Sequence, residues 1–231
     1  MKYNLFSSNT KVADMILQNH TLLDVLPRFE VSIGVGEDTI EKLCDANNIN
    51  PNFFAMVCNI HTFDCYTPSE DELQKIELRS VIDYLQNSHD YYKNRSVSLI
   101  GSKLSNVVEE NHDKYSTLLC TFFEEYKQEI FNHFYYEENI IFPYVNKLID
   151  TEPSEKFRVE QYEDHHASID DKLSDLKNII LKYQPHNGST PKVMEILTEI
   201  FLLEDDLRKH TRIEEKVLTP LVKLKEKGYE W

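Results

Sequence analysis

Glycine is scarce in this sequence, and closely spaced cysteine pairs and long apolar runs are missing. Its 231 residues include only 5 glycines, a composition that suits helices better than a turn-rich β protein. The 4 cysteines contain no Cys-x-x-Cys pair, and so few in a chain of this length do not indicate a disulfide scaffold. We therefore expect free thiols in a reducing compartment.

An excess of basic residues is also absent. Lys and Arg total 25 against 40 Asp and Glu, giving a net charge of −15, and such a surface repels nucleic-acid phosphates and anionic lipid. No stretch approaches the roughly 18 apolar residues that a membrane span requires, and MKYNLFSSNT lacks the apolar core of about 7–15 residues of a secretory signal. We expect a cytoplasmic protein with no nucleic-acid partner and no membrane partner.

What the sequence does contain, from about residue 70 onward, is a nearly continuous helical pattern. Ser69 followed by Glu72 is typical of a capping box that starts a helix. Further helices are expected over about residues 113–148, 151–183 and 192–227. Four long amphipathic helices with short connections predict an all-α fold, an up-down-up-down four-helix bundle.

The first part of the chain has shorter helical segments. Thr10 is expected to cap a helix over residues 12–26, and Asn50 with the proline that follows it starts another. The predicted domains are a small helical N-terminal module at residues 1–66 and the bundle at residues 70–231.

An internal repeat connects two stretches of the bundle. HFYYEENIIFPYV occupies residues 133–145 and HTRIEEKVLTPLV residues 210–222. Their histidines lie 77 residues apart (210 − 133 = 77), and so do their first glutamates (214 − 137 = 77), second glutamates, prolines and final valines. A constant offset indicates that one long helix has been duplicated.

The same offset selects a second pair of histidines. His89 lies 77 residues before His166 (166 − 89 = 77), so each half of the bundle has a histidine and, 44 residues later (133 − 89 = 44), His-x-x-x-Glu. His165 lies beside His166 and fits the apolar face of its helix equally well. The register favours His166, and His165 is the alternative.

The spacing of these residues points to metal. Residues i and i+4 share one helix face, about 6 Å apart, and a buried carboxylate without a partner is costly. Six ligands on one interior would hold two metal ions, and imidazole with carboxylate suits iron, or zinc or manganese. The six candidates are His89, His133, Glu137, His166, His210 and Glu214.

Two simpler interpretations compete with this one. A single His-x-x-x-Glu is usually a surface pair that contributes a few tenths of a kcal/mol. A duplication that kept the bundle and lost its metal would also leave both copies in the sequence.

The residues described above resemble the hemerythrin-like HHE cation-binding domains, and among these the di-iron proteins of the repair of iron centres family. VIDYLQNSHDYY around His89, the glutamate pair with IIFP after His133, and the histidine pair ending at His166 carry the resemblance, which covers almost the whole chain. The family usually has Cys-Cys followed by glycines after its first helix. This chain has VSIGVG at residues 31–36 instead.

The resemblance implies a cofactor and a function. We expect a carboxylate- and oxo-bridged centre of two iron ions with zinc or manganese less favoured, O2 or NO as the small-molecule ligand, and iron–sulfur proteins as partners in repair under nitrosative or oxidative stress. Without the Cys-Cys pair, two alternatives stay open. One is reversible O2 binding or sensing, and the other is a regulatory protein whose metal is structural.

Overall fold

The computed structural model describes residues 4–150, 166–183 and 190–226, with no description of the side chains of residues 166–171 and 190. In these ranges the regular structure is helical, and the one β-bridge pairs Lys11 with Thr39. The chain divides into an N-terminal unit (residues 1–88, 144–155 and 209–231) and a bundle unit (residues 89–143 and 156–208).

The described helices follow the order below. They are α1 (Val12–Gln18), the 3-10 turns η1 (His20–Asp24) and η2 (Leu26–Phe29), α2 (Ile40–Asn47), α3 (Pro51–Thr62), α4 (Glu70–Leu73), α5 (Leu78–Tyr91), the π turn η3 (Tyr92–Ser96), α6 (Val97–Asn111), α7 (Lys114–Tyr136), the π turn η4 (Glu137–Ile141), α8 (Phe142–Asp150), α9 (His166–Tyr183), α10 (Thr190–Ile213), the π turn η7 (Glu214–Leu218) and α11 (Thr219–Glu226).

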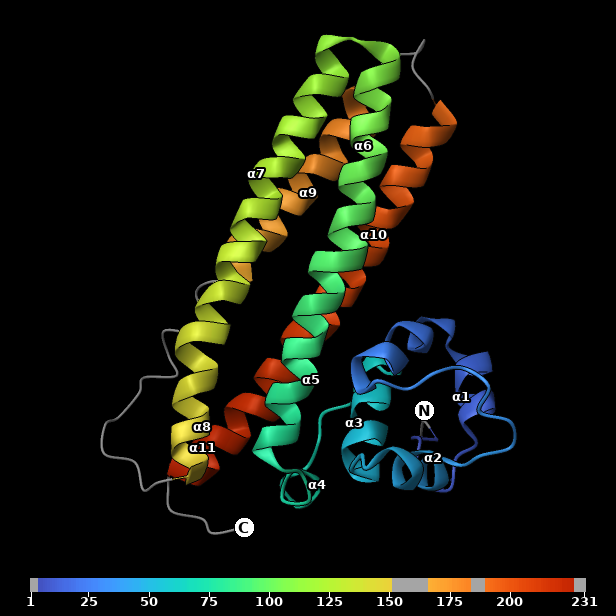
Figure 1. Ribbon diagram of the computed structural model, residues 1–231, viewed down its shortest axis with the longest axis vertical. Coiled ribbons are helices and arrows are strands. Elements are labelled where there is room, and N and C mark those ends of the chain that lie inside the picture. Colours follow the sequence, from blue (N-terminus) through green and yellow to red (C-terminus); the bar gives the residue numbers. More distant parts are fainter. Residues whose placement is uncertain (1–3, 151–165, 184–189, 227–231) are drawn as a thin grey trace. The chain divides into compact units, whose positions relative to one another are not determined.

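The bundle unit is a four-helix bundle built from α6, α7, α9 and α10, which alternate in direction along the chain (Figure 1). α7 packs against both α6 and α9. Apolar residues from all four helices form one buried core, among them Leu104, Phe123, Leu176 and Ile200. The 3–4 spacing of such residues gives each helix one apolar face, and burial of these faces stabilises the bundle.

Caps and breaks agree with the sequence at several helix ends. The Ser69 and Glu72 capping box is present at the start of α4. Asp113 caps α7 by accepting from the amide of Ser116, while His112, in the left-handed region at φ 51°, ends α6. The prediction of an all-α, up-down-up-down bundle with preceding helices is confirmed. Residues 151–165 and 184–189, which cover the expected start of the third helix and most of the loop after it, lie outside the described residues.

One predicted helix near the N-terminus is wrong in its extent. The helix expected over residues 12–26 stops at Gln18, and a 3-10 turn follows. Asn19 causes the break, because its Oδ1 accepts from the amide of Thr21 and its Nδ2 donates to the carbonyl of His61. Thr10 does not cap α1, since its Oγ1 instead accepts from the amide of Ser7.

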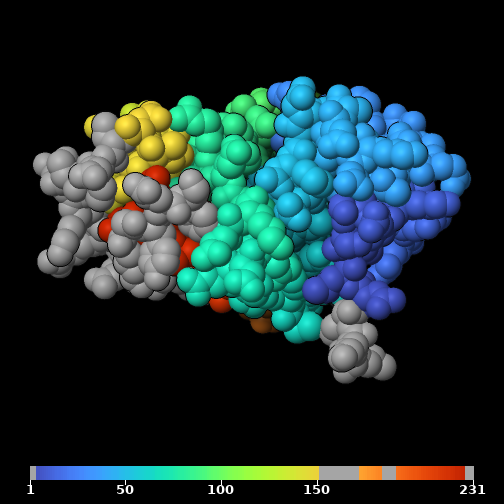
Figure 2. All heavy atoms as spheres, turned by 90° about the horizontal axis from the view of Figure 1, so that it is seen from below, coloured from blue at the N-terminus to red at the C-terminus, as the bar shows by residue number. Residues whose placement is uncertain are grey.

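Within the N-terminal unit, α3 is surrounded by other elements. Nine of its twelve residues are buried, and Figure 2 shows it side by side with the start of α5. His61, in its last turn, is 4% exposed and lies 3.4 Å from the hydroxyl of Tyr84. No pattern in the sequence predicts a buried histidine at this position. The division into domains at residues 1–66 and 70–231 stays a prediction.

Arg212, in α10, is hydrogen-bonded to the end of α3. Its guanidinium donates to four carbonyl oxygens, those of Ile60, Phe63, Asp64 and Tyr66, at 2.9, 3.2, 2.9 and 3.1 Å. Ile60 lies in the last turn of α3, where carbonyls have no partner within the helix and carry partial negative charge, and the other three acceptors follow α3. A cation with several donors fits such a group of carbonyls. α10 is therefore attached to α3 two residues after His210.

None of the helices in the described ranges combines the length and apolar composition that crossing a bilayer requires.

Replacing Arg212 by alanine should lower the free energy of unfolding by about 2–4 kcal/mol, because four carbonyls lose a charged donor together. Urea unfolding followed by circular dichroism measures this. Arg208→Ala is the matched control, since that exposed side chain pairs with Asp205 three residues away on the same helix and its loss should change stability by less than about 0.5 kcal/mol. Equal effects of the two substitutions would contradict the role of Arg212.

Candidate metal centre

Three of the predicted ligands lie together in the bundle unit. His89 is near the end of α5, His133 is in the last turns of α7, and Glu137 begins η4. The Nε2 atom of His89 is 3.1 Å from Oε2 of Glu137, and Nε2 of His133 is 3.4 Å from Oε1 of the same carboxylate. His89 and Glu137 are fully buried, and His133 is 9% exposed. Two imidazoles therefore converge on one carboxylate, one on each oxygen.

The second copy of the motif forms a similar pair on α10 and η7. Nε2 of His210 is 2.9 Å from Oε1 of Glu214, with exposures of 2% and 0%. Val217, Leu218 and Leu221 continue the helix and are all buried. As expected from the i, i+4 spacing, each histidine and glutamate of a pair lie on one face of their helix.

Four of these residues can offer ligand atoms to one ion. One nitrogen or carboxylate oxygen from each of His89, Glu137, His210 and Glu214 lies within 4.8 Å of the others, and all four side chains are buried. His133 contacts this group through Glu137. The side chain of His166 and the whole of His165 lie outside the described residues, so the third-helix ligand stays a prediction.

A π turn follows the ligands on each of these helices. Glu137 and Glu214 begin η4 and η7, in which the amides of Phe142 and Thr219 donate to the carbonyls five residues earlier. The two turns keep the repeat offset (214 − 137 = 77). A third π turn, η3, begins three residues after His89. Such turns insert one residue into a helix and change which side chains face inward, and they occur often at functional sites.

The π turns also account for two prolines. Pro143 and Pro220 each follow a π turn by one intervening residue. Within a regular helix, proline lacks the amide donor and its ring clashes with the carbonyl four residues earlier. The preceding wide turn moves the carbonyls away from that register, so the proline fits where the helix returns to α. Because η3 has no proline after it, proline is not required to form the turn.

Sequence reasoning missed one carboxylate beside the site. Glu138, directly after the predicted ligand, accepts from Nδ1 of His89 at 3.0 Å and from Nζ of Lys93 at 2.7 Å. The hydrogen bond from His89 and the charge of Lys93 hold the pKa of the Glu138 carboxyl down to about 2. The only signal in the sequence was the glutamate pair present in both copies.

The donors present fit a metal ion of the iron or zinc type. Imidazole nitrogens and carboxylate oxygens are the ligands such ions take in proteins, and Glu137 and Glu214 are fully buried acids facing imidazoles. The two carboxylates would balance much of the charge of a divalent ion, which is costly to bury alone. The cluster therefore fits a metal site, without specifying the metal.

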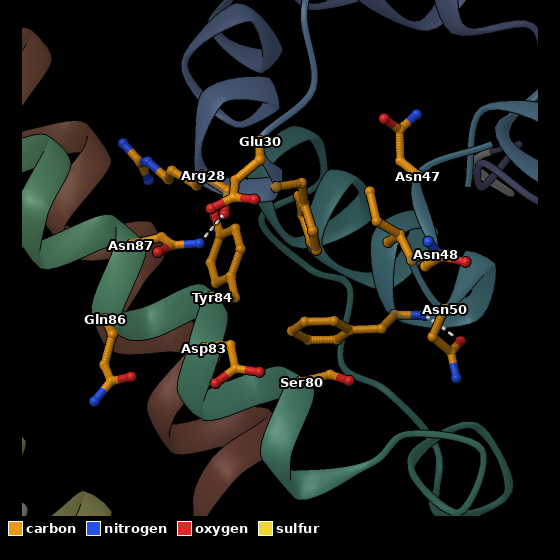
Figure 3. A pocket seen from close by; sticks show the side chains of 13 residues that line it. Arg28, Glu30, Asn47, Asn48, Asn50, Ser80, Asp83, Tyr84, Gln86 and Asn87 are labelled. Carbon is orange, nitrogen blue, oxygen red and sulfur yellow. Dashed lines mark hydrogen bonds between the residues drawn. The ribbon is translucent and has the colours of Figure 1, made fainter. Parts of the chain in front are cut away.

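Two further histidines of the described ranges, His112 and His20, are exposed. A polar cavity of about 370 Å³ in the N-terminal unit is lined by side chains such as Glu30, Asn48 and Asp83 (Figure 3). None of the predicted metal ligands lines it.

Comparison with known protein families gives a match over most of the bundle. Residues 80–222 match the family described as hemerythrin HHE cation binding domain, a stretch that includes every predicted ligand and more than half of the chain. No curated protein matches the sequence. The matched stretch covers the helices that carry the buried His and Glu cluster, and the chain therefore belongs to the hemerythrin HHE cation-binding domain family.

Proposed function

We propose that this chain is a non-haem di-iron protein that binds or reacts with O2 or NO and protects or repairs iron–sulfur centres under nitrosative or oxidative stress. The observation that supports it is the buried cluster of His89, Glu137, His210 and Glu214, whose ligand atoms lie within 4.8 Å of one another. His133 and His166 complete the proposed set of six.

Each ligand has a distinct part in this proposal. The histidines would hold iron through neutral imidazole nitrogens, and the two glutamates would balance its charge and bridge the ions. Bound iron would supply redox chemistry and open positions for a diatomic ligand. Buried Ile141, Phe142 and Val217 follow the ligands on their helices, and these apolar side chains would exclude bulk water from the site.

A second function, reversible O2 binding or sensing without repair, is favoured by the state of the thiols. Burial raises the pKa of Cys44 to about 12 and raises that of Cys58 well above its usual value, so neither forms the reactive thiolate at neutral pH. Cys65 is exposed and Cys120 partly so. A thiol-dependent step of repair would therefore have to use one of these two separate cysteines.

Protein purified without oxygen should contain about two irons per chain, as expected for six nitrogen and oxygen ligands. His133→Ala should lower the iron content markedly, while His20→Ala, which changes an exposed histidine, should not. Metal analysis and absorption spectra before and after NO measure both. A content below about half an iron per chain, unchanged in His133→Ala, would contradict the di-iron proposal.

The third-helix ligand can be identified by separate substitutions. His166→Ala should lose iron and His165→Ala should retain it, because only residue 166 keeps the 77-residue offset (166 − 89 = 77). Iron content and the spectrum of each variant measure this. Loss of iron in His165→Ala alone would show that the repeat register had selected the wrong histidine.

Thiol labelling distinguishes reactive from buried cysteines. At pH 8 an alkylating reagent should modify Cys65 within minutes, and Cys44 and Cys58 far more slowly, because a buried protonated thiol is a poor nucleophile. Mass spectrometry of the digested protein over time measures the rates, with Cys65→Ser as control for site assignment. Similar rates for all three would contradict the burial argument and restore a thiol-dependent repair step.

A further inference from the structure

The ring of His89 is held on every side by residues of the bundle unit. Phe134 stacks on it with centroids 4.1 Å apart and planes at 17°, and the plane of Phe142 lies at 16° with centroids 5.6 Å apart. Nε2 faces Glu137 and Nδ1 faces Glu138. The fully buried ring therefore has one orientation that satisfies both nitrogens.

The contact with Glu138 also determines where the ring carries its proton. An ionised carboxylate can only accept, so Nδ1 donates to Glu138, while Nε2 points the other way, towards the carboxylate of Glu137. A metal-binding histidine commonly donates its other nitrogen to a carboxylate, which fixes the ring and increases its basicity.

Lys93 holds this carboxylate in turn. Its Nζ donates to the same Oε1 of Glu138 at 2.7 Å and lies 5.9 Å from the ring centre of Phe134. Lys93 and Glu138 are 27% and 28% exposed, so the pair lies at the boundary between the buried ring and the surface. Hydrogen bonds therefore connect His89 to Glu138 and Glu138 to Lys93.

The second half of the bundle lacks the same residues. At an offset of 77, Lys93 corresponds to Asp170 (93 + 77 = 170), Phe134 to Thr211 (134 + 77 = 211) and Phe142 to Thr219 (142 + 77 = 219). Glu138 corresponds to Glu215, which is exposed. The basic residue and both aromatic residues around His89 therefore have no residue of their kind at the corresponding positions of the second copy.

We propose that Glu138, held by Lys93, is a positioning residue that fixes the orientation of His89 with its Nδ1 protonated, and that it thereby raises the affinity of the site for metal. This inference rests on the proposed metal-binding function. Removing a carboxylate that holds a ligand histidine typically lowers metal affinity about 10–100-fold, which sets the scale of the expected effect.

The first experiment uses metal-free full-length protein and nitrogen NMR of its histidine rings. His89 should show a single ring state with Nδ1 protonated. Glu138→Gln should keep it, since the amide oxygen still accepts, whereas Glu138→Ala should release it into a mixture. Glu125→Ala, an exposed acid on α7, is the control for loss of one negative charge. An unchanged His89 signal in Glu138→Ala would overturn the proposal.

The second experiment titrates Zn2+ into the same metal-free proteins by calorimetry. The parent should bind Zn2+, and Glu138→Ala and Lys93→Met should weaken this binding about tenfold or more, whereas Glu125→Ala should not. Unchanged Zn2+ affinity in Glu138→Ala would overturn the assignment. If the parent binds no metal at all, the proposed function fails, and the ring state of His89 still decides whether Glu138 positions it.

Discussion

The burial of two carboxylates, Glu137 and Glu214, is the constraint on which the metal centre depends. Both are fully inaccessible and face imidazoles at about hydrogen-bond distance. An acid in this position costs several kcal/mol unless a positive charge compensates it, and neutral histidines do so only in part. A bound cation supplies the missing charge, so the stability of the helices around these acids is linked to occupancy of the site.

The two copies of the ligand motif are more alike in backbone geometry than in the side chains that surround the ligands. η4 and η7 begin at the ligand glutamates, and each is followed by a proline in the same place. The neighbours of the ligands have diverged, with phenylalanine replaced by threonine at two positions. Backbone register is retained because one extra residue would turn both ligands of a pair away from the interior, whereas the neighbouring residues can change and alter the properties of each half separately.

The sequence predicted the features that depend on local spacing. Helices and their apolar faces follow from the 3–4 period, and the pairing of His133 with Glu137 follows from the i, i+4 rule. Features that depend on tertiary contacts were missed. The break at Asn19 is fixed in part by hydrogen bonds to residues more than 40 positions away. His61 is buried because α3 is enclosed, and Glu138 faces His89 from another helix. No local pattern contains that information.

The position of Arg212 has a consequence for how the chain can be divided. Its side chain holds the carbonyls at the end of α3, while its backbone lies between His210 and Glu214 on the same stretch of helix. Arg212 thus has two roles. Its side chain supports the N-terminal helices, and its backbone belongs to the helix that spaces His210 from Glu214. A shortened protein that starts near residue 70 would keep all six proposed ligands and lose the acceptors that hold the helix between two of them. Such a fragment is not a neutral substitute for the full chain.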